Sequence, residues 1–177
     1  MRGMEIFPGV GVEVAKVGEH RDVVEARIGA PVRKPFKQFR MAYDTRPALL
    51  VSYGDHDSLV QLVEVVHVEG GEDVFFDGVQ LTSRWMDDVT ADLEARGYRR
   101  DSSDFGLRFD PGFTIFQEGS LVGFEAPTRL FEGKPRSFCG GVAVAPFHYF
   151  DRLTPEQISA MARGVEEEIQ QRRAQRL

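Results

Sequence analysis

The stretch AKVGEHRDVVEARIGAP, residues 15–31, contains the pattern that predicts the first helix of the chain. The pattern predicts a helix over residues 18–28, and the spacing of Val17, just before it, Val24 and Ile28 would bring their apolar side chains to one face. Gly29 is suited to the end of a helix, and Pro31 prevents the helix from continuing. The charged residues between them fall on the opposite, solvated side. This pattern is typical of a scaffold element rather than of a catalytic site.

A similar pattern returns later in the chain. FDGVQL at residues 76–81 resembles FPGVGV at residues 7–12, and LEARG at residues 93–97 resembles VEARIG at residues 24–29. The strand segments that follow align better at a slightly shorter offset, so the register of the repeat stays open. Each half has the same order of elements, which is a glycine-containing strand, a helix and several strands. This order predicts an internal repeat.

A second helix is predicted over residues 84–96. Two acidic residues, Asp87 and Asp88, would lie in its first turn, where they interact favourably with the helix dipole. Thr82 or Ser83 is the expected N-cap. The apolar face of this helix would consist of Trp85, Val89 and Leu93.

Strand patterns occupy much of the remaining chain. KQFRMAYD at residues 37–44, PALLVSY at 47–53 and SLVQLVEVVHVE at 58–69 are alternating or continuously apolar, and the turn residues YGDHDS separate the last two. Short connections of this kind predict an antiparallel meander. The second half has matching segments: FGLRFD at 105–110, FTIFQE at 113–118, SLVGFEA at 120–126 and GGVAVAPFHYF at 140–150.

The last residues, 151–177, have a clear helix pattern. Thr154 is a suitable N-cap, Pro155 fits the first helical position, and Gln157 completes a capping box. The predicted fold class is therefore α+β, a tandem repeat of a helix packed on an antiparallel β-sheet, with a C-terminal helix. The expected parts of this compact unit are a first α/β repeat, a second one and the C-terminal helix, at residues 1–70, 71–150 and 151–177.

The first helix also has a spacing of residues found in known proteins: Gly18, Val24, Ile28, Gly29 and Pro31. This spacing resembles the helix signature of small helix-plus-antiparallel-sheet modules, which include the outer-membrane assembly lipoprotein BamE and the tandem-repeat β-lactamase inhibitor proteins. The chain has neither the lipoprotein cysteine of the first group nor the disulfide pairs of the second. The resemblance therefore implies a fold shared with cytoplasmic tandem relatives in bacteria, immunity proteins among them.

Composition limits the possible functions. The chain has 177 residues, of which 42% are hydrophobic, and a net charge of -6. It is long enough to bury a core. Its acidic balance argues against nucleic-acid binding, which needs a basic surface, and is compatible with a basic protein partner. The chain has no apolar run of the length of a transmembrane helix and no signal-peptide pattern, so we expect a cytoplasmic protein without membrane contact.

Two motifs with chemically active residues are better explained as structural features. Asp55, His56 and Asp57 are adjacent, but neighbours in a hairpin point to opposite faces, so we expect a solvated turn rather than a metal site. Cys139 is the single cysteine and precedes two glycines. We expect a small buried side chain there rather than a nucleophile. The sequence predicts no catalytic residue, no bound metal and no cofactor.

The segment PFHYFD, residues 146–151, is the candidate for partner binding. Its central side chains cannot all face one core if the segment is a strand, and exposed aromatic rings are favoured at interfaces. These candidates are Phe147, His148, Tyr149 and Phe150. Packing under the C-terminal helix is the alternative, in which case Phe113 and Phe116 are the next candidates.

The function predicted from these observations is a non-enzymatic protein-binding module of the immunity or inhibitor type. The alternative is a small-molecule-binding protein, or an enzyme, with its site between the two halves.

Overall fold

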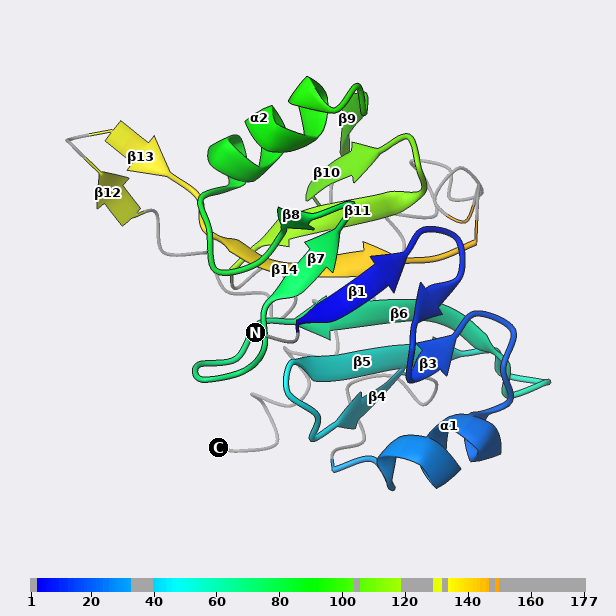
Figure 1. The fold of residues 1–177 in the computed structure, drawn as a ribbon. Coiled ribbons are helices and arrows are strands. Elements are labelled where there is room, and N and C mark those ends of the chain that lie inside the picture. Colours follow the sequence, from blue (N-terminus) through cyan, green and yellow to red (C-terminus); the bar gives the residue numbers. More distant parts are fainter. Residues whose placement is uncertain are drawn as a thin grey trace, which may run out of the picture. The chain divides into compact units, whose positions relative to one another are not determined.

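A computed structural model describes residues 3–32, 40–103, 106–118, 129–131, 134–146 and 149. The chain divides into two compact units, Met1–Pro146 and Phe147–Leu177. All the helices and strands described below belong to the first unit (Figure 1). Its helices are α1 (Arg21–Ile28) and α2 (Met86–Ala95).

A seven-stranded antiparallel sheet contains the larger set of strands, in the spatial order β4-β5-β6-β14-β11-β10-β9. Its strands are β4 (Arg40–Tyr43), β5 (Ala48–Tyr53), β6 (Val60–Val66), β9 (Arg100–Ser103), β10 (Gly106–Phe109), β11 (Phe113–Gln117) and β14 (Cys139–Val144). The first three form an antiparallel meander, with Met41 opposite Val51 and Val51 opposite Val63, as the sequence predicts. The last strand, β14, lies between β6 and β11.

A smaller sheet has the order β3-β2-β1-β7-β8. Its strands are β1 (Met4–Phe7), β2 (Gly11–Val12), β3 (Ala15–Lys16), β7 (Val74–Phe76) and β8 (Val79–Gln80). The two halves of the chain meet where β1 and β7 pair in parallel, with Met4 opposite Val74. A separate hairpin is formed by β12 (Arg129–Phe131) and β13 (Lys134–Arg136).

The core lies between the large sheet and the layer formed by the small sheet and both helices (Figure 1). Along β5, the residues that face this core alternate with half-buried ones, as a strand with one covered face requires. The small sheet contributes Ile6 and Val79, and α1 contributes Val24. The buried core residues of the large sheet include Tyr43, Leu49, Val51, Val63, Val65, Phe109, Phe113, Ile115, Val142 and Val144.

The predicted α+β class, with a tandem repeat of a helix packed on an antiparallel sheet and a C-terminal helix, is wrong. The described chain is mostly β, and its helices have only eight and ten residues. The strands of the two halves do not form separate sheets, because β6 pairs with β14 and β1 pairs with β7. Side-chain periodicity identifies a strand but not its distant partner, which explains the error. Residues 120–126 and 151–177 lie outside the described residues.

Helix α1 begins later than predicted because the residues before it pair with a strand. The Gly18 N–H donates to the Val60 carbonyl, and His20 forms an isolated bridge with Leu59. His20 is the N-cap, and its Nδ1 accepts from the Asp22 N–H at 3.3 Å. The helix ends at Gly29 as predicted, with a φ of 90° that favours glycine.

Helix α2 begins at Met86, and neither predicted cap residue caps it. The Thr82 hydroxyl accepts a hydrogen bond from the Val74 N–H at 3.0 Å, so it is already engaged. Ser83 bonds to the ring of His67. Trp85 occupies the N-cap position, while Asp87 and Asp88 lie in the first turn as predicted. Of the residues predicted to pack against the sheet, Val24, Val89 and Leu93 are fully buried and Ile28 is partly buried.

Candidate functional site

A hollow of about 560 Å³ lies between the β7–β8 hairpin and the second half of α2. It is lined by Phe75, Gly78, Val79, Gln80, Arg84, Asp92, Ala95 and Arg96. Asp77 and Gly78 form the two-residue turn of the hairpin, and both have positive φ angles, as a type I′ turn requires. Contacts between β8 and α2 hold the hairpin beside the helix. All the lining residues lie in one half of the chain, so this hollow is not a site between the two halves.

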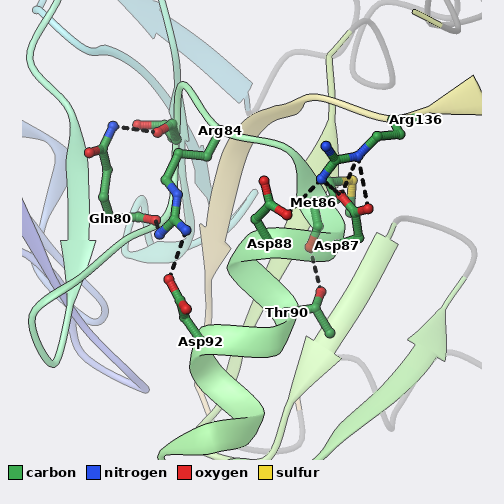
Figure 2. A network of polar contacts seen from close by, with 9 residues as sticks. Gln80, Arg84, Met86, Asp87, Asp88, Thr90, Asp92 and Arg136 are labelled. Atoms are coloured by element: carbon green, nitrogen blue, oxygen red, sulfur yellow. Dashed lines mark hydrogen bonds and ion pairs between the residues drawn. The ribbon is translucent and has the colours of Figure 1, made fainter. Parts of the chain in front are cut away.

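The hollow contains two arginines, each paired with an aspartate. Arg84 Nη2 lies 2.7 Å from Asp92 Oδ2, and Arg84 Nη1 donates to the Gln80 carbonyl at 3.3 Å (Figure 2). Arg96 Nη1 lies 3.4 Å from Asp77 Oδ2. The two ion pairs hold these guanidinium groups in a hollow that is also lined by the apolar side chains of Phe75, Val79 and Ala95.

A second cluster of charges lies at the first turn of α2. Arg136 of β13 donates from Nε and Nη2 to the Asp87 carboxylate, at distances of 2.6 to 3.1 Å, and Nη2 also reaches Asp88 Oδ1 at 2.6 Å (Figure 2). Hydrogen bonds from Arg136 hold the pKa of Asp87 below its usual range. The guanidinium also lies 4.9 Å from the centre of the Trp85 ring, which packs edge-on against Phe138.

The backbone fixes this second cluster to the helix. The Met86 N–H donates to the Ser137 carbonyl, and the Cys139 N–H donates to the Arg84 carbonyl. Trp85 and Phe138 form an isolated antiparallel bridge between these two bonds. Because Arg84 lines the hollow and Trp85 follows it, the hollow and the Arg136 cluster adjoin each other. We call this area, defined by the lining of the hollow together with Trp85, Asp87, Asp88 and Arg136, the α2 surface.

A separate chain of hydrogen bonds attaches α1 to the sheet. The Tyr43 hydroxyl donates to Glu25 Oε1 at 3.3 Å, and the two hydroxyls of Tyr43 and Tyr53 are 2.7 Å apart. Because a carboxylate only accepts hydrogen bonds, the Tyr43 hydroxyl must donate its hydrogen to Glu25. The Tyr53 hydroxyl must therefore donate to Tyr43. Burial is the largest cause that raises the pKa of both phenols, so they remain protonated at neutral pH. This arrangement attaches α1 to the large sheet.

Three of the four residues predicted to bind a partner, Phe147, His148 and Phe150, lie outside the described residues. Tyr149 is half-buried in a turn and makes an interaction within the protein. The fallback candidates Phe113 and Phe116 are both buried. The aromatic segment at residues 146–151 therefore stays a prediction.

The two other motifs have the structural roles that the sequence predicts. Asp55, His56 and Asp57 form an exposed turn, in which Asp57 Oδ1 accepts from the Leu59 N–H at 3.0 Å. Cys139 is fully buried, and this burial raises the pKa of its thiol to about 12. Within the described ranges, no three His, Cys, Asp or Glu residues are grouped so that they could hold a metal ion.

Sequence reasoning did not identify the α2 surface. Its arginines are ordinary charged residues in the sequence, and their aspartate partners are 8 to 49 positions away. The one available signal was Asp77-Gly78, a strong two-residue hairpin motif. It would have placed β7 and β8 side by side before the helix.

Comparison of the chain with protein-family models, curated proteins and solved structures finds no match. None of the helices in the described ranges has the length and apolar character needed to cross a membrane.

Proposed function

We propose that this protein is a non-enzymatic protein-binding module, of the kind that neutralises or regulates a partner, and that the α2 surface contacts that partner. The observation that carries the proposal is the position of Arg136, held by two carboxylates against the face of Trp85. Arginine and tryptophan are enriched among the residues that contribute most to protein–protein affinity. A side chain already fixed by ion pairs loses less conformational freedom on binding.

The neighbouring hollow supports the same proposal. Arg84 and Arg96 present further guanidinium groups beside apolar side chains, so polar and apolar contacts lie close together. The net charge of -6 favours the approach of a basic partner over a long range. Charge steering of this kind changes the association rate more than the final affinity.

The experiment is a comparison of capture by the full chain and its variants from an extract of the source cells. Arg84→Ala and Arg136→Ala should lose a specific captured protein, which mass spectrometry then identifies. Arg99→Ala is the matched control, because Arg99 is highly exposed and neither Arg99 nor its ion-pair partner Asp110 belongs to the α2 surface. Circular dichroism confirms that each variant is folded. If the two α2 variants capture the same protein as fully as the control does, the proposal is wrong.

A small-molecule-binding protein or an enzyme is the second candidate. The volume of the hollow favours it, since ligand pockets have volumes of about 300–1,000 Å³. However, Asp92 and Arg96 are about half exposed, so the hollow is open and would bury little of a small ligand. Capture of a protein that depends on Arg84 distinguishes the first candidate from the second.

A further inference from the structure

The hollow on the α2 surface is balanced in charge. Arg84 is paired with Asp92 and Arg96 with Asp77, and the Asp77 N–H donates to Glu5 Oε1 at 3.1 Å. A charged ligand would have to exchange one exposed ion pair for another, and such pairs contribute little because water and salt screen them. The lining therefore favours a neutral group that leaves both ion pairs intact.

The guanidinium group of Arg84 can contact a neutral group through its face. Its Nη1 donates to the Gln80 carbonyl, and its Nη2 lies 2.7 Å from Asp92 Oδ2. The N–H bonds of a guanidinium lie in the plane of the group, so these contacts occupy its edge and leave its faces without hydrogen bonds. The side chain is 29% exposed, and in the described part of the chain it lies over no aromatic ring.

The ring of Phe75 is a second surface in the same hollow. Phe75 lies on β7 and is half-buried. Among the described residues its ring packs against no other aromatic ring, whereas the neighbouring Phe76 packs against Tyr98 and Phe113. Aromatic rings gain from contact with each other beyond the area that they bury. The lining thus combines an unpaired aromatic ring with the face of a guanidinium.

We infer that this hollow receives an aromatic side chain of the protein partner, with tryptophan as the best fit. The inference rests on the proposed function and names the kind of residue that the site recognises. A ring stacked on the face of Arg84 gains a cation–π contact, while Arg84 keeps its bonds to Gln80 and Asp92. Tryptophan makes the strongest contact of this type and is enriched among the residues that dominate affinity. An aliphatic side chain would gain only apolar contacts.

The exposed side chain of Phe7 offers a contact for the residue next to this aromatic group. Strands β1 and β7 pair in parallel with Glu5 opposite Phe75, and the same register places Phe7 beside Asp77, in the turn of the hairpin. Because Ile6 is buried and Phe7 is 46% exposed, Phe7 lies on the outer face of the small sheet, as Phe75 does. A peptide segment can use this contact, and a free aromatic molecule cannot.

The test uses the full chain and three neutral probes, with binding followed by NMR titration: N-acetyltryptophanamide, N-acetylleucinamide and acetyl-Leu-Trp-Leu-amide. We expect the tryptophan amide to bind about fivefold tighter than the leucine amide, which corresponds to an exposed cation–π contact of ~1 kcal/mol. Arg84→Lys keeps the charge beside Asp92 but removes the planar face, so it should remove most of this preference. Arg99→Lys should leave the preference unchanged.

A variant that fills the hollow tests the location of binding. Ala95→Leu adds an apolar side chain to the lining without a change of charge, and leucine is a good helix former. It should weaken binding of the tryptophan amide. Ala26→Leu is the control, because Ala26 is exposed on α1, outside the α2 surface. Circular dichroism confirms that each variant is folded. Equal binding of the two amides, an unchanged preference in Arg84→Lys, or unchanged binding by Ala95→Leu would each overturn the inference.

The tripeptide separates a partner side chain from a free aromatic molecule. It should bind tighter than the tryptophan amide, and Phe7→Ser should reduce this advantage without weakening the amide itself. If the tripeptide binds no tighter than the amide, the assignment to a protein partner is wrong. The outcome for the proposed function is separate. Arg84-dependent capture of a partner without a preference for tryptophan would reject this inference and keep the function, whereas Arg84-independent capture would reject the function.

Discussion

Arg40 and Glu64 meet across an intervening strand. Arg40 lies on β4 and Glu64 on β6, with β5 between them, and their Nη2 and Oε2 atoms are 2.8 Å apart. The contact is not aligned as a hydrogen bond, so Glu64 Oε2 has no hydrogen-bond partner among the described residues, although its side chain is only 8% exposed. Burial raises the pKa of the Glu64 carboxyl, and Arg40 acts in the opposite direction. The pair thus places an incompletely compensated charge within the large sheet.

This pair predicts a pH-dependent stability. The pKa of Glu64 is raised in the folded state, so the protonated carboxyl stabilises the fold. This contribution of Glu64 to the free energy of unfolding is complete below its ordinary pKa of 4.5, and it is lost as the pH rises through the raised pKa of the folded state. Glu64→Gln removes that loss. The difference in unfolding free energy between the variant and the unmodified chain should therefore shift in favour of glutamine from pH ~4 to ~8. Urea melts across this range measure it, with the exposed Glu69→Gln as the control for the loss of one charge. A difference that does not change with pH would contradict this account.

The buried face of α2 predicts the cost of a cavity. Leu93 is fully buried in the core. Leu93→Ala should reduce the free energy of unfolding by about 2–5 kcal/mol, through lost burial and the space left behind. Equilibrium denaturant melts provide the measurement. A loss well under ~1 kcal/mol would mean that this face of α2 does not pack as described.

The hydrogen bonds of the paired tyrosines predict which of two substitutions destabilises the protein more. Tyr43→Phe leaves the buried Tyr53 hydroxyl without its acceptor and also removes the bond to Glu25. Tyr53→Phe removes one bond and leaves the Tyr43–Glu25 bond intact. A buried donor without a partner costs about 1–3 kcal/mol, more than the net value of a typical hydrogen bond. Tyr43→Phe should therefore destabilise more than Tyr53→Phe, and the reverse order in thermal melts would show that the donor directions are wrong.

The Arg136 cluster predicts a local change in hydrogen exchange. Lysine cannot reproduce the bidentate hydrogen bonding of Arg136 to the Asp87 carboxylate. Arg136→Lys should therefore loosen the pairing beside α2 and speed amide exchange at Met86 and Cys139, whose N–H groups close that pairing. Arg99→Lys serves as the comparison, and unchanged exchange in both variants would mean that the cluster adds nothing to this attachment.

The buried thiol predicts slow chemical labelling. Cys139 is fully buried, and its pKa is raised to about 12, so little thiolate exists at neutral pH. An aromatic disulfide reagent should react with the native protein only as fast as the protein opens, and should react at once in denaturant. Rapid stoichiometric reaction of the native protein would refute the burial of this side chain.

Local patterns in the sequence identified many elements but not their assembly. The alternation of Leu49 and Val51 predicted a strand, and Gly29 predicted the end of α1, because both signals depend on neighbouring residues. The predicted start of α2 was wrong because the Thr82 hydroxyl accepts a hydrogen bond from the Val74 N–H instead of capping the helix. The partner of β14 could not be predicted, because its apolar residues would suit many positions in a sheet. The α2 surface was missed for the same reason, as its ion pairs exist only after the hairpin and helix pack together.

The place of β14 also sets the order in which the protein can fold during synthesis. Val63 of β6 pairs with Val144, which the ribosome adds long after β6 has been made. Until then β6 has an unpaired edge, and closing so large a loop carries an entropic cost. Contacts between residues distant in sequence slow folding, and an exposed strand edge can pair with another chain. A ribosome-bound fragment that ends before β14 should therefore be sensitive to protease and prone to self-association, and the complete chain should lose both properties.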